Sequence, residues 1–92
     1  MRLIDAIQQL ESFDPEATIY GEKPWTEGSQ VVVASEPEAG GLPDEALRRG
    51  FDYFLEVFVA QEFLEDWRAG LSAEPTLQEQ CRRLIQYAVY DA

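Results

Sequence analysis

Glu56 is the residue in this sequence whose predicted surroundings suit acid–base chemistry best. If residues 51–69 form a helix, a rotation of about 100° per residue places Glu56 on the apolar stripe, between Phe63 and Trp67. An ionised carboxylate there is costly to desolvate unless an arginine or other hydrogen-bond donors satisfy it. Such an acid could transfer protons or hold a basic ligand. We favour a structural role, either as an anchoring salt bridge or as a carboxylate that reaches water at the helix start.

The groups that usually accompany a catalytic acid are missing. The 92 residues include no histidine, which removes the commonest general base and the commonest zinc ligand. Glycine-rich phosphate-binding motifs and the Gly-x-Ser-x-Gly nucleophile motif do not occur either. We therefore expect no enzyme activity and no cofactor. The enzymatic alternative, a small enzyme or a regulatory subunit of one, would use Glu56 with Tyr53 or Tyr87 as acid–base groups.

Neither the cysteine content nor the clustered acids predict a metal site. Cys81 is the only cysteine, so no intramolecular disulfide forms, and its place in an apolar stripe predicts a buried, unreactive thiol. Glu62, Glu65 and Asp66 are spaced to converge on the polar side of a helix. Because no calcium-loop spacing or separate partner carboxylate accompanies them, a solvated surface explains them better than a bound cation.

The charge balance restricts the partners. Lysine and arginine number 7 against 18 aspartate and glutamate, which gives a formal net charge of −11. A field of this sign repels nucleic-acid backbones and anionic lipid surfaces, and it attracts basic proteins. Charged residues interrupt the apolar start of the chain within the first five residues, too early for a secretory signal. No run of the sequence approaches the roughly 20 apolar residues of a membrane span. We expect a cytoplasmic protein that binds no membrane and does not bind nucleic acid through a conventional basic patch.

The spacing of apolar residues predicts one α+β domain over residues 1–92, with an N-terminal helix, a two-stranded antiparallel sheet and a C-terminal helical half. The last helix is the clearest element, since Thr76 and Glu79 form a capping-box pattern before an apolar stripe. The other predicted elements are a helix over 3–13, strands at 17–20 and 30–34, and a helical turn at 43–49 closed by Gly50.

Residues 51–69 allow two interpretations. The long periodic stretch that ends at Gly70 favours a helix throughout, with Asp52 as a candidate N-cap. Residues 51–57 also alternate between apolar and polar side chains, which is typical of a third strand. We favour the helix and keep the third strand as the alternative.

Three aromatic residues are candidates for an interface. In the helical interpretation, Phe54 and Phe58 lie one turn apart and outside the main apolar stripe, so they need cover from the rest of the chain or from a second protein. Trp25 lies in a loop between the predicted strands. It either folds back over the edge of the core, which we favour, or anchors a partner.

Three stretches of the chain carry a resemblance: Tyr20-Gly21 with Pro24-Trp25, Tyr53 to Val57 running into Ala60 to Glu65, and Leu84 to Ala88. They are similar to a group of small uncharacterised acidic bacterial proteins, a domain of unknown function. The resemblance implies a bacterial, cytosolic setting and brings no activity or functional residues.

These observations together predict a non-catalytic, acidic protein-interaction module that acts on a protein partner or by self-association as a homodimer. A narrower alternative within the same class is an immunity-type inhibitor that neutralises a basic enzyme by charge complementarity, or a DNA mimic.

Overall fold

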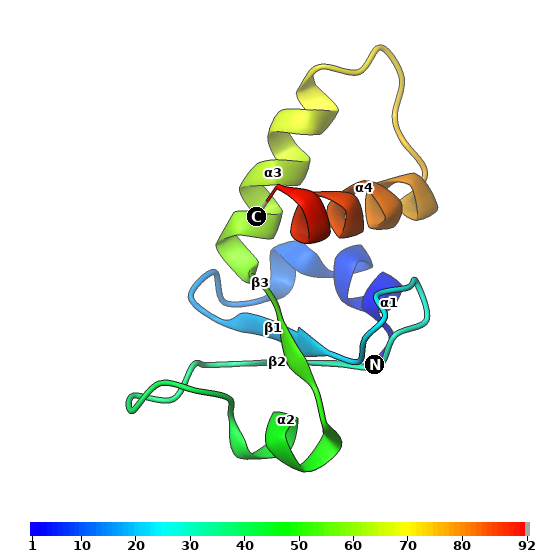
Figure 1. Ribbon diagram of the computed structural model, residues 1–92. Coiled ribbons are helices and arrows are strands. Elements are labelled where there is room, and N and C mark those ends of the chain that lie inside the picture. The colour runs from blue at the N-terminus through cyan, green and yellow to red at the C-terminus, as the bar shows by residue number, and fades with distance from the viewer. Residues whose placement is uncertain (92) are drawn as a thin grey trace.

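The computed structural model describes residues 1–91, and its helices and strands confirm the α+β prediction (Figure 1). In chain order the elements are α1 (Leu3–Gln8), the 3-10 helix η1 (Leu10–Ser12), β1 (Thr18–Gly21), β2 (Val31–Ala34), α2 (Asp44–Arg49), β3 (Asp52–Glu56), α3 (Val57–Ala69) and α4 (Leu77–Tyr90).

The sheet has three antiparallel strands in the order β2-β1-β3. The favoured prediction of a helix over residues 51–57 is therefore wrong, and the alternative of a third strand is right. Alternation and helical periodicity coexist in this stretch, so local sequence leaves the choice open. Hydrogen bonding to β1 decides it, because β3 pairs along the whole of β1, from Thr18 opposite Glu56 to Gly21 opposite Asp52.

A β-bulge interrupts the pairing of β1 with β3. Ile19 lies opposite Leu55 and Tyr20 lies opposite Tyr53, so Phe54 is the additional residue on β3. Phe54 and Leu55 are consecutive, yet both are buried in the main core. The bulge thus turns two successive side chains toward the same face of the sheet.

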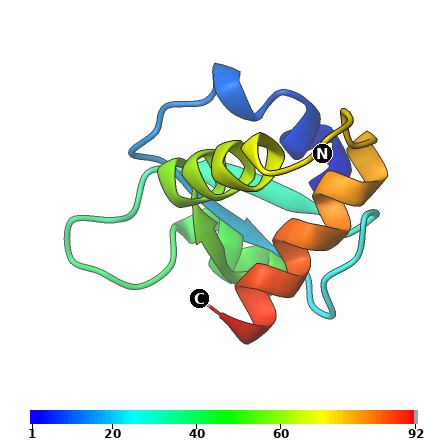
Figure 2. The same cartoon turned by 90° about the horizontal axis from the view of Figure 1, so that it is seen from above.

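Helices α1, α3 and α4 cover one face of the sheet, and Figure 2 shows α3 and α4 lying across the strands. The main core between these layers is almost wholly apolar. Its buried members are Leu3, Ala6, Ile7, Leu10, Ala17, Ile19, Val31, Phe54, Leu55, Val57, Ala60, Leu64, Cys81 and Leu84.

A second, smaller cluster lies on the other face of the sheet, where α2 packs. Tyr20, Ala46 and Phe51 are its buried members. As predicted, α2 ends at Gly50, whose φ of 70° is the left-handed conformation that glycine adopts without strain. The Arg49 guanidinium lies over the Phe51 ring, 4.5 Å from its centroid, and so covers the outer side of this cluster.

The N-terminal apolar stretch is helical, but in two pieces instead of one helix over 3–13. Helix α1 gives way at Gln9, whose φ of −110° and ψ of 23° depart from helical values, and η1 follows. At the other end of the chain the capping box is confirmed. The Thr76 hydroxyl accepts from the Glu79 amide at 3.1 Å, and the Glu79 carboxylate accepts from the Thr76 amide at 3.0 Å.

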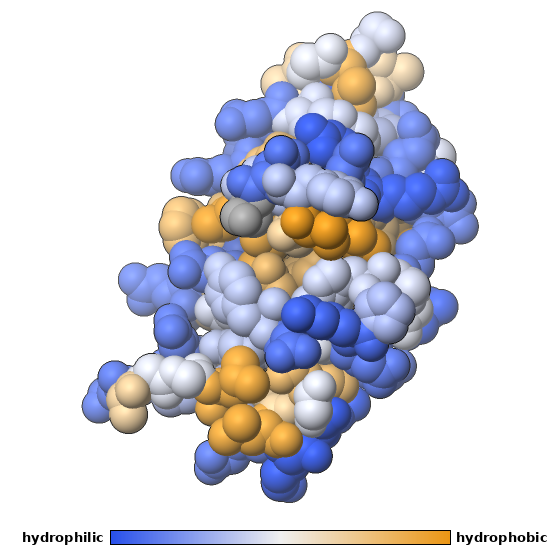
Figure 3. All heavy atoms as spheres, viewed as in Figure 1, coloured by the Kyte–Doolittle hydropathy of each residue, from blue (hydrophilic) through white to orange (hydrophobic). Residues whose placement is uncertain are grey.

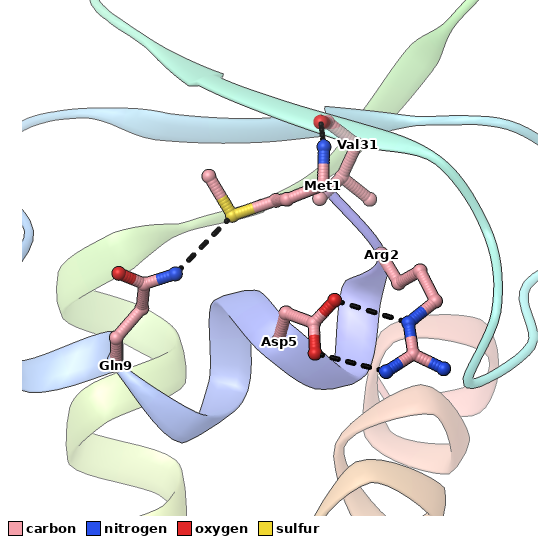
Figure 4. A network of polar contacts seen from close by, with 5 residues as sticks. All are labelled: Met1, Arg2, Asp5, Gln9 and Val31. Carbon is pink, nitrogen blue, oxygen red and sulfur yellow. Dashed lines mark hydrogen bonds and ion pairs between the residues drawn. The ribbon is translucent and has the colours of Figure 1, made fainter.

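Backbone contacts of the first residue fasten the outer edge of β2 (Figure 4). The Met1 ammonium donates to the Val31 carbonyl at 3.4 Å, and the Val31 amide donates to the Met1 carbonyl at 2.8 Å. Arg2 donates from two nitrogens to both carboxylate oxygens of Asp5, at 3.0 and 3.1 Å, and Gln9 donates to the Met1 sulfur at 3.6 Å. The start of α1 is therefore held against β2.

Candidate functional site

The β-bulge places Tyr53 and Glu56 on the same side of the sheet. Residues directly opposite one another on antiparallel strands point to one face, and Thr18 and Tyr20, two residues apart on β1, share a face. Glu56 lies opposite Thr18, and Tyr53 lies opposite Tyr20. Both therefore belong to the face on which Tyr20 packs, away from the main core.

Glu56 does not lie between Phe63 and Trp67, because it is not part of their helix. It is the last residue of β3 and occupies the N-cap position of α3, with an extended φ of −68° and ψ of 144°. The residue is only partly buried. A carboxylate at a helix N-terminus is favoured by the helix dipole, so this position agrees with an acid that reaches water at the helix start.

Two tyrosine hydroxyls lie near this carboxylate and are poor proton-transfer groups at neutral pH. Partial burial, followed by the negative charge of Glu56, raises the pKa of Tyr53 above its usual value. Burial likewise raises the pKa of Tyr20, with Glu36 and Glu56 as smaller causes. The remaining acid–base candidate, Tyr87, is stacked on Phe63 in the helical layer at a centroid distance of 4.2 Å, on the opposite side of the sheet from Tyr20.

The structure separates the three predicted interface aromatics. Phe54 is 3% exposed and belongs to the core, so it is not an interface residue. The bulge is the reason, since it turns Phe54 inward together with Leu55. Trp25 is partly buried and packs edge-on against Phe54, with ring centroids 4.9 Å apart and an interplanar angle of 66°, as the favoured interpretation of its loop position predicted. Only Phe58 remains substantially exposed, at 43%.

Acidic residues surround Phe58. Its amide donates to the Pro15 carbonyl at 3.1 Å, which brings the flanking residues Asp14 and Glu16 beside the first turn of α3. Glu62 follows Phe58 by one helical turn and is also exposed. Tyr53 lies on β3 and Phe58 and Glu62 lie on α3, so these residues are joined at Glu56, where the strand ends and the helix begins. We call this junction, with the exposed residues Tyr53, Phe58 and Glu62 and the partly buried Glu56, the acidic aromatic surface.

Exposed apolar side chains also occur at places that the sequence patterns did not single out. Leu47 on α2 is 60% exposed, and Val89 and Tyr90 at the end of α4 are 50% and 79% exposed. In Figure 3 apolar residues gather over α2 and over the C-terminal part of α4, with hydrophilic residues between them. No sequence signal identified them: Val89 and Tyr90 lie at the end of α4, and Leu47 lies inside α2 beside the buried Ala46.

The acids Glu62, Glu65 and Asp66 are exposed along α3. Within residues 1–91, the structure groups no three side chains of the metal-binding types closely enough to hold an ion. None of the helices in the same range has the length and apolar character needed to cross a bilayer.

The thiol of Cys81 is expected to be inert while the protein is folded. The residue is fully buried, and this burial, with a smaller contribution from the charge of Glu27, raises the pKa of the thiol to about 11. We expect a thiol-reactive dye at about pH 8 to label the native protein far more slowly than the denatured protein. Rapid labelling of native protein would show that α4 opens readily or that the thiol is accessible.

The same shift predicts a loss of stability in alkali. Because the pKa of the thiol is about 11 in the folded protein and has its ordinary value of 9.0 in the unfolded chain, the stabilising contribution of Cys81 is complete below pH 9.0 and declines as the pH rises toward 11. Cys81→Ala, which cannot ionise, should flatten this part of the stability profile, measured by urea unfolding.

No protein-family model, no curated protein and no solved structure matches the chain.

Proposed function

We propose that this protein is a non-catalytic interaction module that binds a basic protein through the acidic aromatic surface. The observation that carries the proposal is the exposure of two aromatic rings, Tyr53 at 50% and Phe58 at 43%, which precede and follow Glu56 along the chain. Exposed aromatic side chains supply large contact area at low entropic cost and are enriched among the residues that dominate binding energy. Acidic side chains around these rings favour a partner whose contact surface is positively charged.

The charge of the whole chain supports a basic partner over a second copy. Among residues 1–91 only two of the 18 acidic side chains, Asp5 and Glu45, form ion pairs. An isologous dimer across the acidic aromatic surface would bring the same acids of both copies together, which costs energy. A basic partner would neutralise them and would be attracted at long range.

A catalytic role for Glu56 has less support. The nearby hydroxyls of Tyr53 and Tyr20 have raised pKa values, and both tyrosines are therefore protonated near neutral pH. No imidazole accompanies them, since the chain has no histidine, and the thiol of Cys81 is buried in the main core on the other face of the sheet. We therefore propose that Glu56 contributes charge and hydrogen-bond acceptors to a contact surface.

The test combines capture of the partner with variants of the surface. The wild-type protein is used to capture partners from its native cells, and the affinity of the captured protein is then measured by calorimetry at several salt concentrations. We expect Phe58→Ser to raise the Kd about tenfold or more, since truncation of an aromatic anchor at an interface costs roughly 1–2 kcal/mol or more. Glu62→Gln should weaken the salt dependence of binding.

Leu47→Ser is the matched control, because Leu47 is at least as exposed as Phe58 but lies on α2. Its Kd should stay within about twofold of wild type. If Leu47→Ser abolishes binding and Phe58→Ser does not, the proposed surface is wrong. A dimer in light scattering that dissociates with Phe58→Ser would replace the basic partner with a second copy.

A further inference from the structure

A polar hollow of about 290 Å³ lies between the N-terminal helical segment and helices α3 and α4, and it shares no residue with the acidic aromatic surface. The core residues at its base, Ile7, Leu10 and Leu64, are almost fully buried, so a ligand would meet mainly the side chains at its border. The polar side chains of that border come from α1, η1, α3 and α4 in turn: Gln8, Glu11, Arg68 and Gln80. Such a border suits a ligand that is itself polar.

Arg68 is held in place at this hollow without a counter-charge. Its Nη1 donates to Gln80 Oε1 at 3.1 Å, and Gln80 Nε2 in turn donates to the Pro75 carbonyl at 3.4 Å. The residue is partly buried, yet within residues 1–91 no carboxylate lies in ion-pair distance of it. A guanidinium has five N–H donors, and one bond to Gln80 leaves the others free to bind a carboxylate group of a ligand.

A charge of the opposite sign borders the same hollow. Glu11 is exposed, and no basic group in the described part of the chain lies in ion-pair distance of its carboxylate. Arg68 and Glu11 thus line one small hollow without pairing to each other. Arg68 would repel a purely cationic ligand, whereas Glu11 and the net charge of −11 would repel a purely anionic one. A molecule that carries one charge of each sign avoids both penalties.

We propose that this hollow binds a small polar α-amino acid as its zwitterion, with the carboxylate on Arg68 and the ammonium group on Glu11. The side-chain amide of Gln8 borders the same hollow and can both donate and accept, which suits a polar side chain on the ligand. The volume of about 290 Å³ corresponds to about ten groups the size of a water molecule, which limits the ligand to a small amino acid.

The probes are L-serine and two analogues that each lack one charge: N-acetyl-L-serine, which has no ammonium group, and L-serinamide, which has no carboxylate. Each is titrated into the ¹⁵N-labelled full chain at about pH 6.5, where carboxylates and α-amino groups are both ionised. L-Serine should shift the amides of residues around the hollow, including Glu11 and Arg68, with a Kd on the order of 1 mM. Each analogue should bind at least about threefold more weakly, because it loses one of the two charge contacts.

Variants that remove one charge of the hollow should affect the analogues in opposite ways. Arg68→Gln should weaken L-serine and N-acetyl-L-serine about fivefold or more, and it should not weaken L-serinamide. Glu11→Gln should weaken L-serine and L-serinamide by about two- to threefold, since this carboxylate is exposed, and should strengthen N-acetyl-L-serine. If Arg68→Gln fails to fold, the analogues on the wild-type chain and Glu11→Gln still decide the question.

Two control variants remove the same charges from exposed residues that do not line the hollow. Arg82→Gln is the control for Arg68→Gln, and Glu38→Gln is the control for Glu11→Gln. Each should change the Kd for L-serine less than about 1.5-fold, because solvent and salt screen charges at a distance. Losses as large as those of the variants in the hollow would reduce the effect to general charge and overturn the assignment.

The probes themselves can also overturn the proposal. L-Serine that shifts no amide around the hollow at concentrations up to about 20 mM would show that no amino acid binds there. If N-acetyl-L-serine or L-serinamide binds as tightly as L-serine, one of the two charges has no role and the ligand is not a zwitterion held between Arg68 and Glu11.

Discussion

Phe54→Ala is expected to lower the free energy of unfolding by about 3–5 kcal/mol, the usual cost of truncating a buried phenylalanine. The ring is 3% exposed, packs edge-on against Trp25 and lies at the bulge of β3, where the backbone cannot easily close a cavity. Chemical denaturation followed by tryptophan fluorescence measures the change, because Trp25 contacts the ring that is removed.

Phe58→Ala is the matched control for this loss. It removes the same atoms four residues further along the chain, but Phe58 is 43% exposed and its truncation should cost about 1 kcal/mol or less. If the two variants lose equal stability, the assignment of Phe54 to the core and of Phe58 to the surface is wrong.

Gly21→Ala should destabilise the protein by about 1–3 kcal/mol, although alanine is usually tolerated better than glycine in a strand. A Cβ at position 21 would lie 2.7 Å from Val31 Cγ1, 3.0 Å from the Gln30 carbonyl oxygen and 3.1 Å from Trp25 Cζ3. The carbonyl belongs to the paired backbone and cannot move freely, so β1 and β2 must separate or Trp25 must shift. The measurement is again the midpoint of denaturation.

Gly28→Ala is the control in the same β1–β2 connection. Its Cβ would meet only Thr26 Oγ1, at 4.0 Å, and the residue has no positive φ. We expect no loss, or a gain of about 0.4–1 kcal/mol from the lower entropy of the unfolded chain. A comparable loss of stability in both variants would mean that the loss comes from reduced backbone flexibility of the β1–β2 connection and not from the close contacts of a Cβ at position 21.

Phe54→Asp places a charge in the core and should unfold the protein, so the loss of an interaction in that variant says nothing about an interface. Phe58→Ser changes an exposed residue and leaves the core intact.

Sequence alone determined the elements that local interactions specify. The capping box of Thr76 and Glu79 fixed the start of α4, Gly50 fixed the end of α2, and the apolar stripe of α4 placed Cys81 in the core. In each case the deciding contacts lie within a few residues along the chain, where periodicity and capping rules apply directly.

Tertiary structure alone decided the state of residues 52–56 and, with it, the roles of Phe54, Glu56 and Phe58. Strand and helix patterns were both present in that stretch, and pairing with β1, more than 30 residues earlier in the chain, selected the strand. The bulge then buried Phe54 and moved Glu56 out of the apolar stripe. The two local patterns do not show which partner strand is available, which is why the sequence favoured a helix for Phe54 and Glu56.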